Sequence, residues 1–315
     1  MSRLCEASVD MKAIILAAGS GTRCYPLTYL YPKIFQQVGG IPILEYMLSW
    51  FSGMPEIEKL YLVMNKAGVE SIERYMKNRN SYLPKISRLF SLLGYKVECR
   101  NPNFVIEVIE AGGRGTGGDL RLALDTITAK DILGEDFIVC NGDYITIRRV
   151  ADGALSPQIN LAGIVRHHRM CKQELQTVMT VSLVPVKKED ARRFGVAHVQ
   201  QVNNFHIIEN FVEKPDKDGI RQKPLVNAGI YIIDRDFILP RLDKYLPDKD
   251  GTTLERTLIG QLVSEAKPRL AAYFLDLHRW FDIGTLEQLV EANICIALER
   301  SEANQSRRTK IRSFS

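Results

Sequence analysis

Short apolar runs alternate with segments of helical periodicity along the first half of the chain. The runs have the length and the β-branched content of buried strands, and they lie at residues 12–17, 59–64, 96–99, 105–109 and 137–140. The segments between them repeat apolar residues every three or four positions, which predicts helices at residues 42–54, 68–78, 83–93 and 118–126. This order predicts an α/β fold with a Rossmann-like, mostly parallel sheet and helices on both faces, in which ligands bind at the carboxyl ends of the strands.

The second half of the chain has a different pattern. Two alternating runs at residues 196–202 and 205–212 flank Asn203 and Asn204, which tolerate positive φ angles, so we predict an inserted antiparallel hairpin. Further strands are predicted at residues 177–184, 226–233 and 269–275, and helices at residues 253–266 and 285–300. We expect one domain over residues 11–299, made of halves at 11–143 and 144–299. An extension at residues 1–10 precedes it, and a disordered basic tail at residues 300–315 follows it.

Composition narrows the class of protein. The chain has 315 residues, of which 45% are hydrophobic, so it can bury a sizeable core, and its formal net charge of +5 comes from charges of both signs. No apolar run reaches the roughly 18 to 20 residues of a membrane span, and the mild charge excess does not indicate nucleic acid. The six cysteines stand singly, which argues for a reducing compartment and against structural zinc. We therefore expect a cytoplasmic globular protein that binds neither nucleic acid nor a membrane.

The loop after the first predicted strand has the composition of a phosphate site. Gly19 and Gly21 let the backbone approach an anion with its N–H groups, Arg23 adds a planar fork of donors, and Lys33 adds a compact charge. Two familiar glycine loops do not match. No Gly-Lys-Ser/Thr of a P-loop follows, and Cys24 stands where the dinucleotide fingerprint needs its third glycine. The loop therefore predicts a polyphosphate ligand.

The same region resembles the signature of a known family, the sugar-1-phosphate nucleotidyltransferases, which make nucleotide sugars. The resemblance begins with MKAIILAAGSGTRCYPLTYLYPK at residues 11–33 and continues through VGGIPIL at 38–44. Further motifs follow in the family's order: NGD at 141–143, RFGV at 193–196, EKP at 213–215, NAG at 227–229 and WFDIGT at 280–285. By this resemblance, nucleotide binding is expected from Ala17, Ala18, Gly19, Gly21, Thr22, Glu110, Gly115 and Thr116.

Two aspartates are the candidate metal ligands. Asp143 follows a predicted strand in an Asn-Gly-Asp sequence, and Asp282 precedes the closing helix; on local sequence alone, one could be a turn residue and the other a helix cap. The resemblance implies that both hold Mg²⁺, which prefers a few carboxylates together with phosphate oxygens and water. With Arg23 and Lys33 they are the expected catalytic residues.

The resemblance also implies a sugar-phosphate site. Lys214 is expected to bind the phosphate, Glu213 the ring hydroxyls and Asn227 a further polar group, with Gly142 and Gly195 beside them. The implied reaction is attack by a hexose 1-phosphate oxygen on the α-phosphorus of a nucleoside triphosphate, which releases pyrophosphate. No histidine is needed, and we expect His167 and His168 at a solvated helix end. The protein could also form a homo-oligomer.

The identity of the base depends on Glu110. Relatives that use pyrimidines commonly have a glutamine there, whereas a carboxylate only accepts hydrogen bonds and suits the adjacent N–H groups of guanine. We therefore predict GTP and, by resemblance, mannose 1-phosphate; the alternative is a glucose-1-phosphate thymidylyl- or uridylyltransferase. The glycine-rich segment 111–118 departs from the family at Arg114, where an apolar residue is common. An inactive paralogue that binds nucleotide sugars and regulates an active partner is the alternative of another class, and a dehydrogenase lacks its fingerprint.

Overall fold

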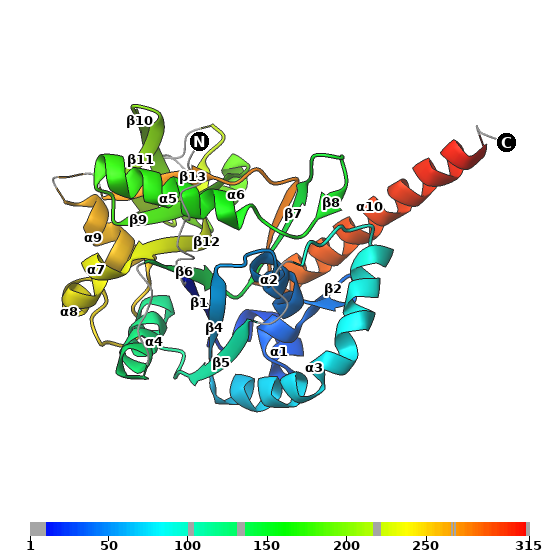
Figure 1. The fold of residues 1–315 in the computed structure, drawn as a ribbon, viewed down its shortest axis with the longest axis horizontal. Coiled ribbons are helices and arrows are strands. Elements are labelled where there is room, and N and C mark those ends of the chain that lie inside the picture. Colours follow the sequence, from blue (N-terminus) through cyan, green and yellow to red (C-terminus); the bar gives the residue numbers. More distant parts are fainter. Residues whose placement is uncertain are drawn as a thin grey trace, which may run out of the picture.

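A nine-stranded sheet forms the centre of the computed structural model, which describes residues 11–99, 104–130, 136–216, 222–265, 267 and 269–312. The strand order is β10-β11-β13-β9-β12-β6-β1-β4-β5 (Figure 1). These strands are β1 (Met11–Ala17), β4 (Ile57–Met64), β5 (Val105–Glu110), β6 (Asp136–Asn141), β9 (Met179–Pro185), β10 (Gly195–Val202), β11 (Phe205–Glu213), β12 (Leu225–Asp234) and β13 (Leu270–Phe274). Two small sheets contain β7 (Tyr144–Arg149), β8 (Leu155–Ser156) and β14 (Arg279–Asp282), and β2 (Gln37–Val38) and β3 (Ile41–Pro42).

Both faces of the large sheet are buried, because side chains alternate along each strand. In β1, Ala13 and Ile15 belong to one apolar core, whereas Ile14 and Leu16 belong to another. The first core is covered by α2 (Ile43–Ser52), α3 (Lys66–Leu92), α5 (Leu161–Leu175) and α10 (Leu286–Arg312). The second is covered by α4 (Thr116–Lys130), α7 (Arg235–Ile238), α8 (Leu242–Tyr245), a π-helical turn (Glu255–Ile259) and α9 (Gly260–Val263). The α/β prediction with helices on both faces is confirmed.

Strand direction differs from the prediction in half of the sheet. β6, β1, β4 and β5 run parallel as expected. Beyond them, β12 is antiparallel to β6 and β9, and β10, β11 and β13 form further antiparallel pairs, while β13 and β9 run parallel. β10 also pairs with β12, so this part closes on itself like a small barrel. The prediction of a mostly parallel sheet is therefore wrong: the sheet is mixed, because an apolar run reports burial and not direction.

The hairpin prediction is confirmed by β10 and β11. They pair antiparallel from Val202 opposite Phe205 to Gly195 opposite Glu213, and Asn203 between them has a φ of 53°. A two-residue connection of this kind can join only antiparallel neighbours. The hairpin thus determines the direction of the strands at this end of the sheet.

Several predicted elements have other boundaries in the structure. Residues 96–99 form no strand and contribute only a bridge between Tyr95 and Leu155 at their edge. The two helices predicted at 68–78 and 83–93 are one helix, α3, which continues through Pro84. The helix predicted at 253–266 is shorter and begins with the π-helical turn. The closing helix α10 continues to Arg312, through most of the stretch predicted to be disordered. α5, β7 and β14 were not predicted, and residues 1–10 lie outside the described part.

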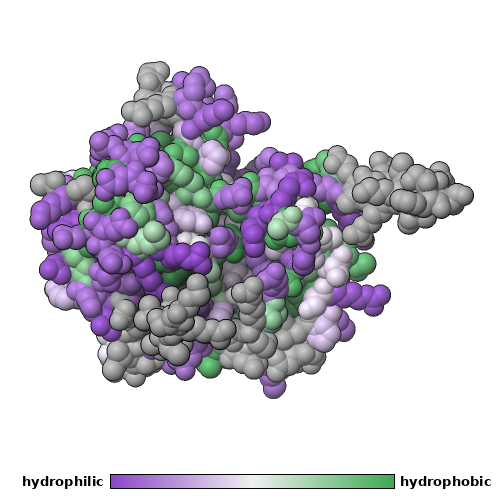
Figure 2. Space-filling model, turned by 45° about the horizontal axis from the view of Figure 1, so that its top comes forward, coloured by the Kyte–Doolittle hydropathy of each residue, from purple (hydrophilic) through white to green (hydrophobic). Residues whose placement is uncertain are grey.

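The surface of this face is mostly hydrophilic, with apolar atoms in small separate areas (Figure 2). None of the helices in the described part combines the length and the apolar character that crossing a bilayer requires. The five cysteines of the described residues are all free thiols.

A buried ion-pair cluster corrects the expectation for the histidines. His168 is fully buried, with its Nδ1 2.9 Å from Thr180 Oγ1 and its Nε2 3.7 Å from Asp136 Oδ2. Lys172 Nζ donates to Asp136 Oδ1 at 2.7 Å and lies 3.2 Å from Asp234 Oδ2. Burial raises the pKa of Asp136, but His168 and Lys172 outweigh burial and hold it below its ordinary value of 3.8. The cluster ties α5 to β6, so the prediction of a solvated helix end is wrong.

We expect Asp136→Asn to destabilise the protein by about 3–5 kcal/mol at pH 7, because Lys172 loses a buried partner. Since the pKa of Asp136 is lowered in the folded state, its contribution is fully present above the ordinary carboxyl pKa and is lost as the pH falls through the lowered value. The difference between the two proteins should therefore shrink below about pH 4. Urea unfolding of both proteins across this pH range measures it. A constant difference at all pH values would contradict the assignment.

Candidate active site

The loop after β1 presents its backbone and Arg23 to solvent. Gly21 has a φ of 66°, its carbonyl oxygen accepts hydrogen bonds from Thr28 Oγ1 at 2.7 Å and from the Cys24 N–H at 2.8 Å, and the 3-10 helix η1 (Thr22–Cys24) follows. The guanidinium of Arg23 is exposed and pairs with no carboxylate of the described residues. A left-handed glycine directly before a helical turn is an arrangement that exposes N–H groups to an anion. The predicted phosphate loop is therefore free to receive a ligand.

Asp143 and Asp282 are far apart in sequence and adjacent in the fold. Asp143 lies in the turn between β6 and β7, and Asp282 ends β14, which pairs antiparallel with β7 so that Asp282 is opposite Tyr144. The Ile283 N–H donates to the Asp143 carbonyl oxygen at 2.8 Å. Gly142 holds this turn against β1, because its N–H donates to the Leu16 carbonyl at 2.8 Å and a Cβ there would lie 2.9 Å from Ala17 Cβ. Both aspartates therefore lie beside the phosphate loop.

Two cations neutralise this pair of carboxylates. Lys33 Nζ donates to Asp143 Oδ2 at 2.7 Å, and Arg193 Nη2 and Gln288 Nε2 donate to Asp282 Oδ2 at 3.0 and 3.1 Å. Burial and the nearby charge of Asp143 raise the pKa of Asp282 to about 6. Burial lowers the pKa of Lys33, but Asp143 outweighs burial and raises it above its ordinary value. The two carboxylates repel each other, so another cation between them would be favourable.

The carboxylate pair fits Mg²⁺ better than a metal that needs an all-protein site. Asp143 Oδ1 is buried and accepts no hydrogen bond from any described residue, so it is available as a ligand. No group of three or more metal-ligating side chains occurs in the described part of the chain. Mg²⁺ is the ion that commonly accepts one or two carboxylates and completes its shell with phosphate oxygens and water.

The glycine-rich segment 111–118 lies on the other side of the phosphate loop. A Cβ at Gly113 would lie 3.1 Å from the Ala18 carbonyl oxygen, and one at Gly115, whose φ is 86°, would overlap the Thr252 carbonyl oxygen. Arg114, the residue that departs from the family, pairs with Asp248 and Asp250 at 2.6 Å each. Its side chain therefore fastens this segment to the loop before the π-helical turn, a structural role that leaves base selection to other residues.

Glu110 and Thr116 flank this segment. Glu110 ends β5 and is exposed. Thr116 begins α4, and its Oγ1 accepts a hydrogen bond from the Leu254 N–H at 3.0 Å. Glu110 is thus accessible to a base, whereas the Thr116 hydroxyl already has a partner within the protein.

The predicted sugar-phosphate residues gather at the open ends of β10, β11 and β12. A Cβ at Gly195 would overlap the Phe211 ring and lie 2.9 Å from Glu213 Oε2, so Gly195 makes room for both side chains. Lys214 has a φ of 51° and an exposed side chain, which reaches within 3.8 Å of Glu213 Oε1. Asn227 is buried; its Oδ1 accepts from the Gly229 N–H at 2.9 Å and its Nδ2 donates to Tyr231 OH at 2.6 Å.

Glu255 is a site residue that sequence reasoning missed. Its Oε1 accepts from Asn227 Nδ2 at 3.2 Å and from Tyr231 OH at 3.3 Å. Burial raises the pKa of Glu255, and burial together with the charge of Glu255 raises that of Glu213, whose Oε2 is buried and has no partner among the described residues. Glu255 opens the π-helical turn, a feature frequent at functional sites, but no sequence motif marks it. Two buried carboxylates that lack donors suit a ligand rich in hydroxyl groups.

Comparison with known proteins connects this site to chemistry. The family model described as nucleotidyl transferase matches residues 12–298. Among curated proteins, the bifunctional protein GlmU of Methanococcus vannielii is 27% identical over 287 residues, which are 90% of this chain and 54% of that protein. A probable mannose-1-phosphate guanylyltransferase of Oryza sativa subsp. japonica is 27% identical over 275 residues, 87% of this chain and 61% of the relative. The chain thus spans about half the length of these curated relatives.

Solved structures show the same fold. A UDP-glucose pyrophosphorylase complexed with UDP-glucose superposes with a TM-score of 0.63 at 20% identity and covers 92% of this chain and 99% of its own. A UTP-bound UGPase from Acinetobacter baumannii gives a TM-score of 0.67 at 19% identity, covering 97% of this chain and 99% of its own.

Proposed function

Because the chain belongs to the nucleotidyl transferase family, as its resemblance in sequence predicted, we propose that it is a sugar-1-phosphate nucleotidyltransferase. The observation that carries the proposal is the position of Asp143 and Asp282 on neighbouring strands beside the loop of Gly19, Gly21 and Arg23. In the reaction, a phosphate oxygen of a hexose 1-phosphate forms a bond to the α-phosphorus of a nucleoside triphosphate. The bond from that phosphorus to the bridging oxygen breaks, and pyrophosphate leaves with the electron pair.

The residues of the site supply position and charge rather than a base. The attacking phosphate is already an anion at neutral pH, so no proton has to be removed, and the requirement is to bring two polyanions together. We assign Arg23, Lys33 and the N–H groups from Ala17 to Thr22 to the triphosphate. Asp143 and Asp282 would hold Mg²⁺, which supplies charge neutralisation at the reacting phosphates when bound.

The sugar phosphate is assigned to the open end of the hairpin. Lys214 has the exposed ammonium group that a phosphate needs, and Glu213 and Glu255 have free acceptor positions for ring hydroxyls. Gly142 and Gly195 provide the space, and Asn227 orients Glu255. We propose a hexose 1-phosphate on this basis.

We expect Lys214→Met to weaken binding of the sugar 1-phosphate about 10- to 100-fold while changing binding of the nucleoside triphosphate much less, because a charge-assisted hydrogen bond contributes about 1.5–3 kcal/mol. Isothermal titration with each ligand separates the two effects. Lys244→Met, an exposed lysine on α8, is the matched control. Equal losses for both ligands would show that Lys214 lies between them and that the assignment is wrong.

For the base we propose guanine, and mannose as the sugar. The exposed carboxylate of Glu110 at the end of β5 can accept hydrogen bonds from adjacent N–H groups but cannot donate one to a uracil or thymine carbonyl. The relatives point both ways: one curated relative is a probable mannose-1-phosphate guanylyltransferase, and one structural relative holds UTP. Uridylyl and thymidylyl transfer to glucose 1-phosphate remain the alternatives.

Pyrophosphate release over a grid of four nucleoside triphosphates and several hexose 1-phosphates tests class and substrate together. We expect the highest rate with GTP and mannose 1-phosphate, and Glu110→Gln should shift the GTP:UTP and GTP:dTTP ratios toward the pyrimidines by about one to two decades. Glu107→Gln on the same strand is the control. A wild-type preference for UTP or dTTP would overturn the guanine assignment. No release with any pair would favour the regulatory paralogue.

A further inference from the structure

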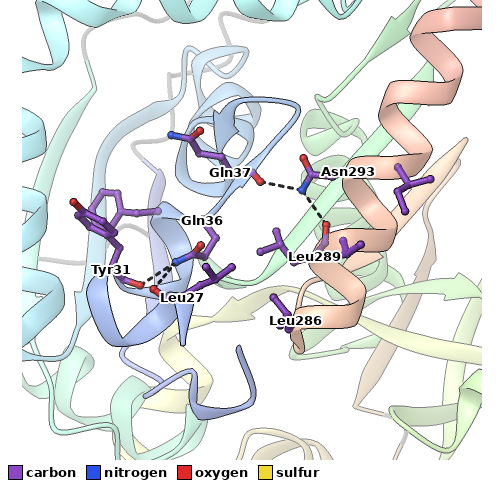
Figure 3. A pocket seen from close by; sticks show the side chains of 10 residues that line it. Leu27, Tyr31, Gln36, Gln37, Leu286, Leu289 and Asn293 are labelled. Atoms are coloured by element: carbon purple, nitrogen blue, oxygen red, sulfur yellow. Dashed lines mark hydrogen bonds between the residues drawn. The ribbon is translucent and has the colours of Figure 1, made fainter. Parts of the chain in front are cut away.

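An apolar groove opens where the segment after the phosphate loop meets the first turns of α10. It has a volume of about 500 Å³, and Figure 3 shows Leu27 and Tyr31 on one side, from α1 (Leu27–Leu30) and the residue after it, and Leu286 and Leu289 on the other. The polar groups of the groove are already bonded within the chain: Gln36 Nε2 donates to the carbonyls of Leu27 and Tyr31, and Asn293 Nδ2 to those of Gln37 and Leu289. The remaining surface suits an apolar protein segment better than a polar small molecule.

Large apolar side chains extend the groove along α10. Val290, Ile294 and Leu298 are 51%, 54% and 60% exposed, and they recur every four residues, so they form one stripe. Leu30 is 72% exposed beside the groove. The opposite side of α10 packs into the core through Leu289, Ala292 and Ile296. α10 therefore has an apolar side turned to its own domain and a second apolar side without cover from the described residues.

α10 also leaves the body of the molecule. It has 27 residues, so it is about 40 Å long, and its second half projects away from the domain (Figure 1). A single helix surrounded by water is marginal by itself, because helices in proteins depend on packing for most of their stability. The projecting half thus calls for a protein surface to lie on.

The charges along this side of α10 indicate what the surface is. Positions spaced alternately by three and four residues share one side of a helix, and in sequence they are Glu287, Glu291, Ile294, Leu298, Ser301, Gln305, Arg308 and Arg312. The acidic residues are at the beginning of the helix, beside the groove, and the basic residues are at the projecting end. Two such helices placed antiparallel put Glu291 of each at the level of Arg308 of the other.

We propose that the projecting end of α10 lies along the groove and the acidic first turns of α10 of a second copy, and that the two copies exchange these ends reciprocally. The contact is self-complementary, since one patch holds both the groove and the helix that fills it, which is the condition for a two-fold symmetric dimer. The apolar stripe lies under the partner's helix, and the charges select the antiparallel direction.

Light scattering coupled to size-exclusion chromatography and sedimentation velocity of the full chain test this dimer over a wide range of concentration. We expect a dimer for the wild type and dissociation for Glu291→Arg, which brings like charges together. The double variant Glu291→Arg with Arg308→Glu should restore the dimer, whereas Glu174→Arg, a charge reversal at an exposed position of α5, should leave it intact. Circular dichroism confirms that each variant is folded.

A second variant keeps the proposal open to refutation. Ile294→Glu should also give monomers, because it places a charge in the apolar stripe at a position that is already half exposed and should fold normally. A wild-type monomer at every concentration would overturn the proposal. So would a dimer that survives in a chain shortened after Arg300, or a double variant that stays monomeric while Glu291→Arg alone dissociates.

Discussion

Asp282→Asn is expected to lower pyrophosphate release by about a hundredfold to a thousandfold and, at the same time, to leave the protein as stable as the wild type or more stable at pH 7. The loss follows if Asp282 helps to stabilise charge at the reacting phosphates, for which one lost group commonly costs about 10²–10³ in rate. The stability follows because the pKa of Asp282 is raised to about 6, so the folded protein ionises this carboxyl at a cost. The asparagine oxygen can still accept from Arg193 and Gln288.

The sign of the pH dependence gives an independent check. A carboxyl whose pKa is raised from 3.8 to about 6 in the folded state lowers stability progressively as the pH rises between these values, by about 1–3 kcal/mol in total. Asp282→Asn should lack this decrease in urea unfolding measured from pH 4 to pH 7. Asp143→Asn should lose activity similarly without the gain in stability, because Lys33 then loses its ion pair. Near-normal turnover in Asp282→Asn would refute the two-carboxylate site.

Lys33→Met should reduce turnover by about the same factor, for a different reason. Lys33 is nearly buried and sits on Asp143 at 2.7 Å, within reach of the loop that carries Arg23, so we expect its charge to serve the triphosphate during transfer. Steady-state kinetics should show a lower kcat, and titration should show weaker binding of the nucleoside triphosphate than of the sugar 1-phosphate.

The matched control for Lys33 is Lys96→Met. Lys96 also pairs with an aspartate, Asp152 at 2.8 Å, but both side chains are about half exposed and lie away from the glycine loop. Its removal should leave turnover unchanged. If Lys33→Met and Lys96→Met behaved alike, Lys33 would be a structural partner of Asp143 only.

The sequence by itself determined those features that depend on local pattern. Apolar runs identified β1, β4, β5, β6 and β12 because buried strands need continuous apolar residues, and the Asn203-Asn204 turn identified the hairpin. The motifs from residue 11 to 33 and from 280 to 285 identified the family, which the match over residues 12–298 confirms. They also pointed to Asp143 and Asp282, although the metal role of both is still a prediction.

Only the tertiary structure decided which distant residues meet. Strand direction in the second half depends on pairing partners such as β12 with β6 and β9, and apolar runs carry no information on it. Glu255 has no motif, and it became a site residue only because the fold brings it to Asn227 and Tyr231. His168, polar in sequence, is buried because Asp136 and Thr180 lie within reach of its ring in the folded chain. Contacts between residues far apart in sequence are set by packing of the whole chain, which is why local pattern could not reveal them.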